Sequence, residues 1–389
     1  MLPFADDLAA EIQVLESRSR LRRCQPADGP SRTTLTAASQ PRISFCSNDY
    51  LGLATHPALQ AAALAAISRS GLGAGSARLV SGTFSDHLVL EQHLASMVRM
   101  PAAVLYSSGY LANIGVLTAL AGPEDLIVAD HSVHASIVDG CRLSHAKFAV
   151  YPHLNLSVAE RHLTRLSPRA RRRFIVTESL FSMDGDFAPL PELAAMAQRH
   201  GAALVVDEAH ALGILGPSGA GLSALSGITP DVLIGTLGKT MGASGAFVAS
   251  TVQLCDYLIN RSRTFIYNTA MPPAVAAAAQ AAVRLLASPA GDILRDKLQA
   301  SILTIRTNLG LPTHPSPIIP ILLGSDADAL QAADRLKEHG FHVQAIRPPT
   351  VPEGTARLRL TVSAQHTNGQ IDSFLKAMAS SRILPASPR

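Results

Sequence analysis

Short apolar runs recur along the chain, and longer stretches of helical periodicity separate several of them. Such runs, rich in β-branched and aliphatic residues, are typical of buried strands. Because strands and helices alternate, the pattern predicts an α/β fold whose mostly parallel sheet is covered by helices on both faces. The expected strands are 43–45, 103–106, 126–129, 148–150, 174–177, 204–206, 232–234 and 246–248.

Helices are expected where apolar residues recur every three to four positions. Such stretches lie at 5–23 and 84–100, and a further helix is expected to begin near Leu111. An alanine-rich stretch at 274–287 contains Gln280 and Arg284, so it predicts a soluble helix and not a membrane span. No membrane partner is therefore expected.

The pattern changes after the alanine-rich stretch. Prolines keep the loop at 347–352 out of any helix. The surrounding pattern is that of a small α+β domain, with strands at 318–322, 342–346 and 357–362 and helices near 326–339 and 369–380. We expect three parts, which are an N-terminal helix and linker at 1–41, a large domain at 42–284 and a small C-terminal domain at 285–389.

Composition narrows the classes of function. Of the 389 residues, 47% are hydrophobic and 16% are charged, which suits globular domains with a sizeable core. The net charge of +4 is mild, and the chain has no Trp and only 4% aromatic residues. It lacks the basic and aromatic surfaces on which many proteins bind nucleic acids, so no nucleic acid is expected as a partner.

The cysteines and histidines do not suggest a metal site. The four cysteines are far apart, which argues against both zinc binding and a disulfide framework. His131 and His134 are three residues apart, but no third ligand is evident nearby. The N-terminus is acidic and lacks a signal-peptide core. We therefore expect a cytoplasmic protein without a metal.

The stretch 205–241 carries the densest candidate chemistry. One apolar run ends at Asp207, and His210 follows three residues later. A second apolar run, 232–234, leads into the glycine-flanked Lys239. If the two runs are neighbouring parallel strands, their C-terminal ends place these three side chains around one crevice.

Two motifs in this stretch point to different chemistry. Residues 207–210 spell the Asp-Glu-Ala-His motif of a class of helicases, and 238–240 spell the end of a P-loop. A P-loop requires a glycine five residues before Gly238, where this chain has Leu233. The lysine motif also follows the acidic one, which reverses the usual order. A nucleotide-dependent ATPase or helicase is kept as a distant alternative.

The polar residues of the stretch suit pyridoxal 5'-phosphate (PLP). A buried carboxylate such as Asp207 stabilises the protonated pyridine nitrogen, and a lysine that has lost its proton forms an imine with the cofactor. His210 is placed to reach the phenolic oxygen, and Thr236 offers a hydroxyl to the phosphate. The turn from strand to helix at 107–110 exposes backbone N–H groups, which also suits a phosphate. Our working hypothesis is that Lys239 holds PLP.

Several motifs together resemble the α-oxoamine synthases, and the resemblance covers nearly the whole chain. The motifs are Asp207-x-x-His210, Thr236-x-x-Lys239 and residues 47–52, 108–110, 134–136 and 182–186. The family consists of PLP enzymes of fold type I that condense an amino acid with an acyl thioester. Segments 266–273, 345–352 and 354–360 are most similar to the branch that acts in biotin synthesis.

The resemblance implies a reaction and partners. L-alanine would condense with a pimeloyl thioester, carried on coenzyme A or on an acyl carrier protein, and CO2 would be released. A sister synthase that uses glycine or serine with another acyl thioester stays open as an alternative. The resemblance also implies a homodimer, in which Thr269 of the second chain helps to bind the phosphate.

By position in the motifs, the resemblance also implies a role for each candidate residue. Lys239 would hold the cofactor and remove the α-proton, while Asp207 pairs with the ring nitrogen and His134 stacks on the ring. The other cofactor contacts would come from Ser182 and His210 at the phenolic oxygen, and from Gly109, Tyr110, Thr236 and Thr269 at the phosphate. The substrate contacts would come from Asn48 and Arg359 at the amino-acid carboxylate, and from Arg22, Arg347 and Thr350.

Overall fold

The computed structural model describes residues 2–24, 26–29, 31–37 and 40–383, so the last residues of the predicted C-terminal domain, 384–389, lie outside it. The chain divides into two compact units. We call Asn48–Ser182 with Asp186–Asp296 the central unit, and Met1–Ser47 with Met183–Gly185 and Lys297–Arg389 the terminal unit. The domain boundaries predicted from the sequence stay a prediction.

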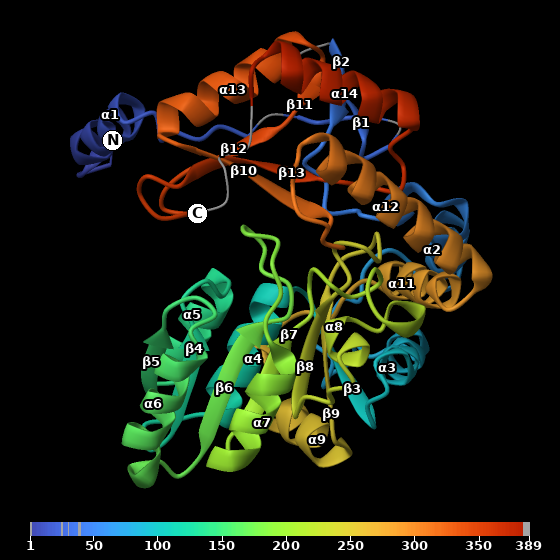
Figure 1. The fold of residues 1–389 in the computed structure, drawn as a ribbon. Coiled ribbons are helices and arrows are strands. Elements are labelled where there is room, and N and C mark those ends of the chain that lie inside the picture. The colour runs from blue at the N-terminus through green and yellow to red at the C-terminus, as the bar shows by residue number, and fades with distance from the viewer. Residues whose placement is uncertain (1, 25, 30, 38–39, 384–389) are drawn as a thin grey trace. The chain divides into compact units, whose positions relative to one another are not determined.

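The central unit is built on one sheet of seven strands (Figure 1). Among the strands in the described part of this sheet, β9 alone runs in the opposite direction to the others, so the predicted mostly parallel sheet is confirmed. In spatial order the strands are β3 (Ala102–Tyr106), β9 (Ala246–Ser250), β8 (Val232–Thr236), β7 (Ala203–Asp207), β6 (Arg173–Glu178), β4 (Leu126–Asp130) and β5 (Lys147–Tyr151).

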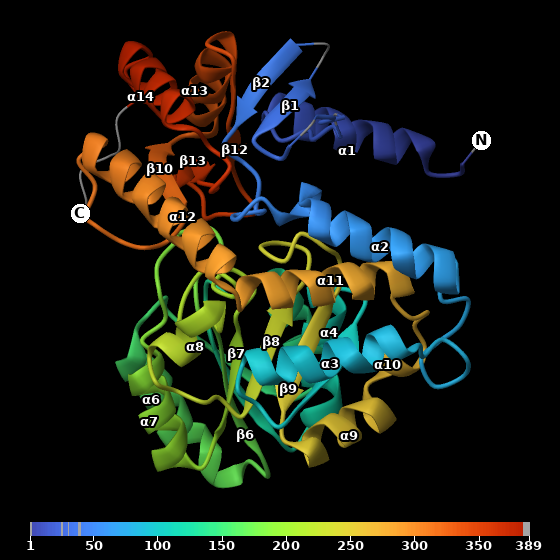
Figure 2. The ribbon, with the colours of Figure 1, turned by 90° about the vertical axis from the view of Figure 1, so that its right-hand side faces the viewer.

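Helices lie on both sides of this sheet (Figure 1). Because both faces are covered, the sequence of each strand is a nearly continuous apolar run. Every residue of β4 and of β9 is buried. The alanine-rich helix α11 packs against α2 and α3, where small side chains allow close approach (Figure 2). The helices of this unit are α2 (Pro57–Ser70), α3 (Ser85–Met97), α4 (Gly109–Leu120), α5 (Ala135–Leu143), α6 (Leu156–Leu166), α7 (Leu190–His200), α8 (Leu222–Leu225), α9 (Val252–Arg261), α10 (Arg263–Ile266) and α11 (Pro273–Leu286). Helix α12 (Pro289–Asn308) begins in the central unit and ends in the terminal unit.

The terminal unit holds two three-stranded sheets, β1-β2-β11 and β10-β13-β12. Its core includes Phe45, whose ring stacks on those of His366 and Phe374 at 4.1 Å. The elements are α1 (Ala5–Ser17), β1 (Thr34–Ala37), β2 (Gln40–Ser44), β10 (Ile318–Gly324), α13 (Asp326–Glu338), β11 (Phe341–His342), β12 (Gln344–Ile346), β13 (Ala356–Thr361) and α14 (Asn368–Ser380).

Three details of the predicted elements are wrong. The run 342–346 is not one strand, because β11 pairs with β2 while β12 pairs with β13 of the other sheet. The first helix ends at Ser17 and not at residue 23, since Ser19 adopts a left-handed backbone and Arg20 pairs with Asp326 and Glu353. The polar stretch expected as a linker contains β1, which pairs with β2.

In the described ranges, no helix combines the length and the apolar character that crossing a bilayer requires.

Candidate active site

The candidate site lies at the C-terminal ends of β6, β7 and β8. The strands run in parallel, and their register places Glu178 beside Asp207 and Asp207 beside Ile234. The prediction that the two runs of the stretch 205–241 are neighbouring strands is therefore confirmed. The turns after β7 and β8 carry His210 and Lys239, and the structure brings these two side chains together.

A chain of hydrogen bonds runs from Lys239 through His210. Lys239 Nζ lies 2.7 Å from His210 Nε2, and His210 Nδ1 lies 2.7 Å from the hydroxyl of Tyr50. The Tyr50 hydroxyl in turn donates to Asn48 Oδ1 at 3.2 Å. The predicted carboxylate ligand Asn48 is thus joined to the predicted base Lys239 through a tyrosine that the sequence analysis did not select.

Asp207 is buried, and both of its carboxylate oxygens accept hydrogen bonds. Asn113 Nδ2 donates to Oδ2 at 2.8 Å, and the backbone N–H of Ala209 donates to Oδ1 at 2.9 Å. Asn113 Nδ2 also donates to Ser136 Oγ at 3.0 Å, which lies 2.7 Å from His134 Nδ1. Asn113 therefore orients Asp207 and links it to His134, although nothing in the sequence singles out this residue of α4.

His134 is electrostatically coupled to the rest of the site. Burial lowers the pKa of its imidazole, the Asp207 carboxylate raises it, and the Lys239 ammonium lowers it again, with a net lowering. The ring is therefore neutral at physiological pH. A neutral imidazole with an exposed side chain is a suitable surface for stacking on an aromatic ring.

Glu178 is a further member of the site that the sequence analysis missed. Burial and the neighbouring Asp207 raise the pKa of its carboxyl to about 8, although the Lys239 ammonium and the backbone N–H groups of His134 and Ser182 act in the opposite direction. Within the described part of the chain, its buried Oε1 has no hydrogen-bond partner. Glu178 ends an apolar strand as Asp207 does, so the same signal identifies both.

We expect Glu178→Gln to stabilise the cofactor-free protein at pH 8 but hardly at pH 4.5. In the folded state Glu178 keeps its proton up to about pH 8, whereas an unfolded glutamate ionises near pH 4.3. Folding therefore takes up a proton within this window, and the stability of the wild type falls as the pH rises through it. Glutamine has a similar shape and carries no such penalty. Thermal unfolding should show a gain in Tm that grows by several degrees from pH 4.5 to pH 8.

Glu192→Gln is the matched control for that experiment. Glu192 is an exposed glutamate on α7 of the same unit. Its substitution should change Tm by a similar small amount at both pH values. A gain for Glu178→Gln that does not depend on pH would show that Glu178 is ionised in the folded protein.

The predicted phosphate contacts meet at the turn from β3 into α4. Ser108 Oγ caps the helix by accepting from the N–H of Leu111 at 3.2 Å. A Cβ placed on Gly109 would lie 3.9 Å from Thr236 Cβ and Oγ1, so this glycine faces Thr236 across a narrow gap. Tyr110 follows, and the edge of its ring faces the ring of His134 at 6.3 Å. The structure therefore brings Gly109, Tyr110 and Thr236 together.

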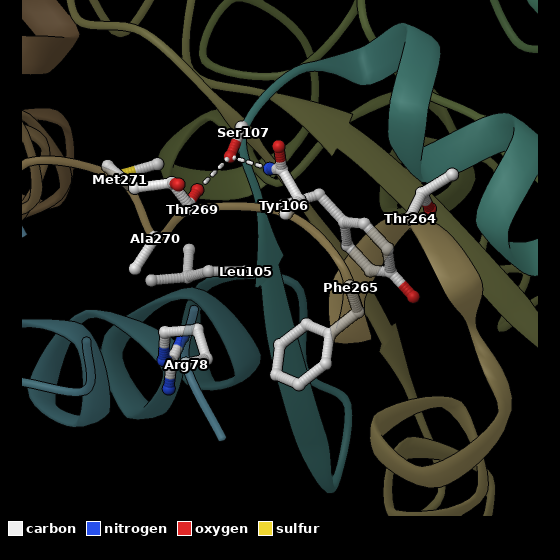
Figure 3. Close-up of a pocket in the computed structure, with 10 residues that line it drawn as sticks. Arg78, Leu105, Tyr106, Ser107, Thr264, Phe265, Thr269, Ala270 and Met271 are labelled. Atoms are coloured by element: carbon white, nitrogen blue, oxygen red, sulfur yellow. Dashed lines mark hydrogen bonds between the residues drawn. The ribbon is translucent and has the colours of Figure 1, made fainter. Parts of the chain in front are cut away.

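Thr269 lies beside the same turn in the same chain (Figure 3). Its carbonyl oxygen accepts a hydrogen bond of 3.2 Å from Ser107 Oγ, and its backbone pairs with Ala77. The pocket of Figure 3 also contains Arg78, which forms an ion pair of 3.0 Å with Glu91. The predicted contribution of Thr269 to the site of a second chain stays a prediction.

His153 connects two loops that carry predicted site residues. Its Nδ1 lies 2.8 Å from Asp130 Oδ1, and its Nε2 lies 2.9 Å from Asp186 Oδ2. Burial disfavours its charge, but the hydrogen bonds to both carboxylates outweigh this and raise the pKa of the imidazole to about 10. Asp130 precedes the loop of His134, and Asp186 follows the loop of the buried Ser182. A protonated His153 thus stabilises both loops.

The remaining predicted substrate residues belong to the terminal unit. Arg359 is buried on β13 and lines a cavity of about 240 Å³ together with Cys46 and His342. Arg22 Nη2 donates to Thr350 Oγ1 at 3.4 Å, and the N–H of Thr350 donates to the carbonyl of Arg347 at 3.1 Å. The structure therefore brings Arg22, Arg347 and Thr350 together.

Comparison with known proteins identifies related enzymes. The family model "Aminotransferase class I and II" matches residues 40–378. The 8-amino-7-oxononanoate synthase of Methylococcus capsulatus is 45% identical over 381 residues, which is 96% of this chain and 97% of that protein. A solved structure of serine palmitoyltransferase from S. paucimobilis with a bound PLP–myriocin aldimine has a TM-score of 0.91 and 30% identity, over 99% of this chain and 100% of that one.

A solved 8-amino-7-oxononanoate synthase from Francisella tularensis is also similar, with a TM-score of 0.75 and 30% identity over 88% of this chain and 98% of that one. These matches confirm the predicted fold type and the predicted resemblance to the biotin-synthesis branch of the α-oxoamine synthases. The ATPase alternative has no support among them and is dropped.

Proposed function

Because the chain belongs to the class I and II aminotransferases and, among them, to the 8-amino-7-oxononanoate synthases, we propose that it condenses L-alanine with a pimeloyl thioester. The products are 8-amino-7-oxononanoate, CO2 and the free carrier, in the synthesis of biotin. The observation that carries the proposal is the contact of 2.7 Å between Lys239 and His210, at the strand ends that also hold Asp207.

The cofactor is PLP, and the donor set of the central unit fits it. The helix terminus at Gly109 and the hydroxyl of Thr236 suit a phosphate, and Asp207 supplies an oriented carboxylate for the pyridine nitrogen. The hydroxyl of Ser182 and His210 Nε2 suit the phenolic oxygen. When bound, PLP withdraws electrons from the α-carbon of the amino acid and so makes that carbon acidic.

The residues around Lys239 control where protons go. Lys239 holds the resting cofactor and then takes the α-proton of alanine at Nζ as a general base. His210 Nε2 lies 2.7 Å from Lys239 Nζ, and this contact orients the amine. Glu178 keeps its proton at neutral pH because of burial and of Asp207, which raise its pKa to about 8. Asp207 is therefore the carboxylate available to the ring nitrogen.

The substrates are recognised by cations and amides. Arg359 presents a guanidinium that can bind the carboxylate of alanine with two parallel hydrogen bonds, and Asn48 contributes its side-chain amide. The cluster of Arg22, Arg347 and Thr350 contacts the thioester substrate. Two cations in this cluster suit an anionic substrate, whether the carrier is coenzyme A or an acyl carrier protein.

The enzyme acts as a homodimer in the cytoplasm. An apolar surface on the central unit supports the dimer, with Leu72 at 74%, Val80 at 81% and Tyr267 at 72% exposure. Val80 and Leu72 lie between α2 and α3, and the backbone of this segment pairs with the segment of Tyr267 through Ala77 and Thr269. Exposed apolar side chains that cluster on a surface are typical of protein interfaces.

The direct test is product formation by the purified PLP-loaded protein. L-alanine should give 8-amino-7-oxononanoate, detected by mass spectrometry, with pimeloyl-coenzyme A or with pimeloyl-acyl carrier protein. Glycine and serine, each offered with pimeloyl, acetyl, succinyl and palmitoyl thioesters, test the sister activities. The proposal is wrong if alanine gives no product with either pimeloyl carrier, or if glycine or serine with another thioester reacts faster.

A further inference from the structure

His153 lies between two carboxylates of the central unit, and each carboxylate belongs to a different loop. Its Nδ1 lies 2.8 Å from Asp130 Oδ1, and its Nε2 lies 2.9 Å from Asp186 Oδ2. An ionised carboxylate only accepts hydrogen bonds, so both ring nitrogens must donate, and only the imidazolium form of histidine has two N–H groups. The raised pKa of about 10 agrees with this geometry. His153 is therefore a cation that bridges two anions.

The first carboxylate fixes the loop that leads to His134. Asp130 ends β4 and is only 1% exposed. Besides contacting His153, its oxygens accept from the N–H groups of Ser132 and of Leu154, each at 2.8 Å. A carboxylate buried this deeply is costly unless a cation pairs with it, and His153 supplies that cation. The start of the loop, two residues before His134, is thus held by a charged pair.

The second carboxylate belongs to the turn that carries Ser182. The backbone carbonyl of Asp186 accepts from the N–H of Phe181 at 3.0 Å and so closes this turn. The ring of the buried Phe181 meets the ring of His153 edge to face, with the ring centres 4.5 Å apart. His153 therefore contacts both ends of the turn. Because Ser182 directly follows Phe181, these contacts also determine where its hydroxyl lies.

We infer that His153 is a positioning residue that couples the loop of His134 to the turn of Ser182. The inference rests on the proposed function, in which His134 stacks on the ring of PLP and Ser182 contacts the phenolic oxygen. The two segments follow different strands, β4 and β6, and the imidazolium bridges them. Two contacts to the cofactor are therefore expected to depend on one cation.

The coupling follows from the charge of the bridge. Each of the two carboxylates raises the pKa of the His153 imidazole, against the effect of burial. Loss of either carboxylate therefore makes the imidazolium less stable. The remaining bond then loses part of its charge assistance, and charge-assisted hydrogen bonds are about twice as strong as neutral ones. A change at Asp186 should thus loosen the loop at Asp130, although these two side chains meet only through His153.

Asp186→Ala tests the coupling in the cofactor-free protein. The N–H groups of His131 and Ser132 are hydrogen-bonded in the folded protein, so their exchange with deuterium reports opening of the loop of His134. In the variant we expect peptides that cover 131–133 to exchange about tenfold faster or more, as for the loss of a hydrogen bond to a charged group. Mass spectrometry of the peptides measures the rates at one pH.

Two further variants make this test specific. Asp186→Asn keeps an acceptor for His153 Nε2, so it should retain most of the protection. Glu160→Ala is the matched control, because Glu160 has a side-chain exposure of 41% against 37% for Asp186 and also lies against a histidine, with Oε1 3.4 Å from His200 Nε2. Its removal should leave the exchange of 131–133 unchanged.

A measurement on the wild type keeps the inference testable if Asp186→Ala does not fold. A histidine of ordinary pKa, about 6.5, is neutral at pH 8.5. Long-range ¹H–¹⁵N spectra at this pH should still show an imidazolium with protons on both nitrogens, and Asp186→Asn should lower the pKa of this group. Spectra without any imidazolium would show that His153 is neutral and would overturn the inference.

In the loaded enzyme the coupling should reach the cofactor. We expect Kd for PLP to rise about tenfold in Asp186→Ala, again as for the loss of a hydrogen bond to a charged group. The visible absorption band of the bound PLP should shift, because the hydroxyl of Ser182 is displaced from the phenolic oxygen. Glu160→Ala should change neither quantity. The inference is wrong if Asp186→Ala leaves either the exchange of 131–133 or the affinity for PLP unchanged.

These outcomes are separate from those of the proposed function. Faster exchange and weaker PLP binding in Asp186→Ala, together with a wild type that makes no product from alanine, support the role of His153 and reject the proposed function. Unchanged exchange, in a protein whose wild type makes the expected product, rejects the role of His153 alone.

Discussion

Lys239→Ala is expected to lower kcat at least about 10³-fold, because the variant loses both the amine that holds the cofactor and the general base. A positioned general base alone contributes about 10²- to 10⁴-fold. The side chain of Lys239 is half-buried in the turn that follows β8. Its truncation therefore leaves little cavity, and the fold should persist. Release of CO2 from alanine and a pimeloyl thioester measures the loss.

A second measurement locates the cofactor itself. After reduction with borohydride, peptide mass spectrometry of the wild type should find PLP on the peptide of Lys239, and Lys239→Ala should carry none. Lys147→Ala is the control, because Lys147 is an exposed lysine on β5 of the same unit. It should keep the label and the turnover. A Lys239→Ala variant within tenfold of the wild-type rate would remove Lys239 from both roles.

The fold was predictable where burial is complete. Strands covered on both faces carry continuous apolar runs, and the polar residue that ends each run marks the edge of the sheet. This is why Asp207, with its neighbours His210 and Lys239, could be located from the sequence. The run 342–346 shows the limit of the method, because its apolar pattern is continuous while its two halves pair in different sheets.

The connecting residues of the site were not predictable from local pattern. Asn113 lies in the interior of α4, where an asparagine marks neither an end of the helix nor a site. Only the packing of α4 against the sheet brings its side chain to Asp207. Tyr50 occurs within a segment that resembles the family, but its bond to His210 joins positions 160 residues apart. Glu178 could have been selected at the end of its strand. Its retained proton depends on burial and on Asp207, which require the three-dimensional structure.

Asp207→Asn is expected to lower kcat about 10²- to 10³-fold, a loss typical for removal of one preorganised electrostatic group. The substitution preserves size but removes the negative charge that stabilises the protonated ring nitrogen of PLP. It also places a side-chain amide next to Asn113 Nδ2, which donates to Asp207 Oδ2 at 2.8 Å in the wild type, so two donors can face each other. Asn113 Nδ2 also donates to Ser136 Oγ. The loss could therefore come from the charge or from a disturbed hydrogen-bond chain.

A double variant separates these two causes. Asp207→Asn combined with Asn113→Asp exchanges donor and acceptor and can restore the bond between the two side chains, but it moves the charge onto α4. We expect no recovery of kcat, because the charge must face the ring nitrogen. Recovery to within tenfold of the wild type would assign the loss to hydrogen-bond geometry instead.

The neighbouring Glu178 supplies a further test of whether the position of the charge matters. Asp207 helps to raise the pKa of Glu178, so this pKa should fall in Asp207→Asn and Glu178 should ionise as the pH rises. A carboxylate then returns to the site, but on the adjacent strand, about 4.8 Å away in the sheet. If any nearby negative charge sufficed, kcat of Asp207→Asn would recover toward pH 8 relative to the wild type. We expect the ratio of the two kcat values to stay constant from pH 6.5 to pH 8, because the oxygens oriented by Asn113 and Ala209 belong to residue 207 alone.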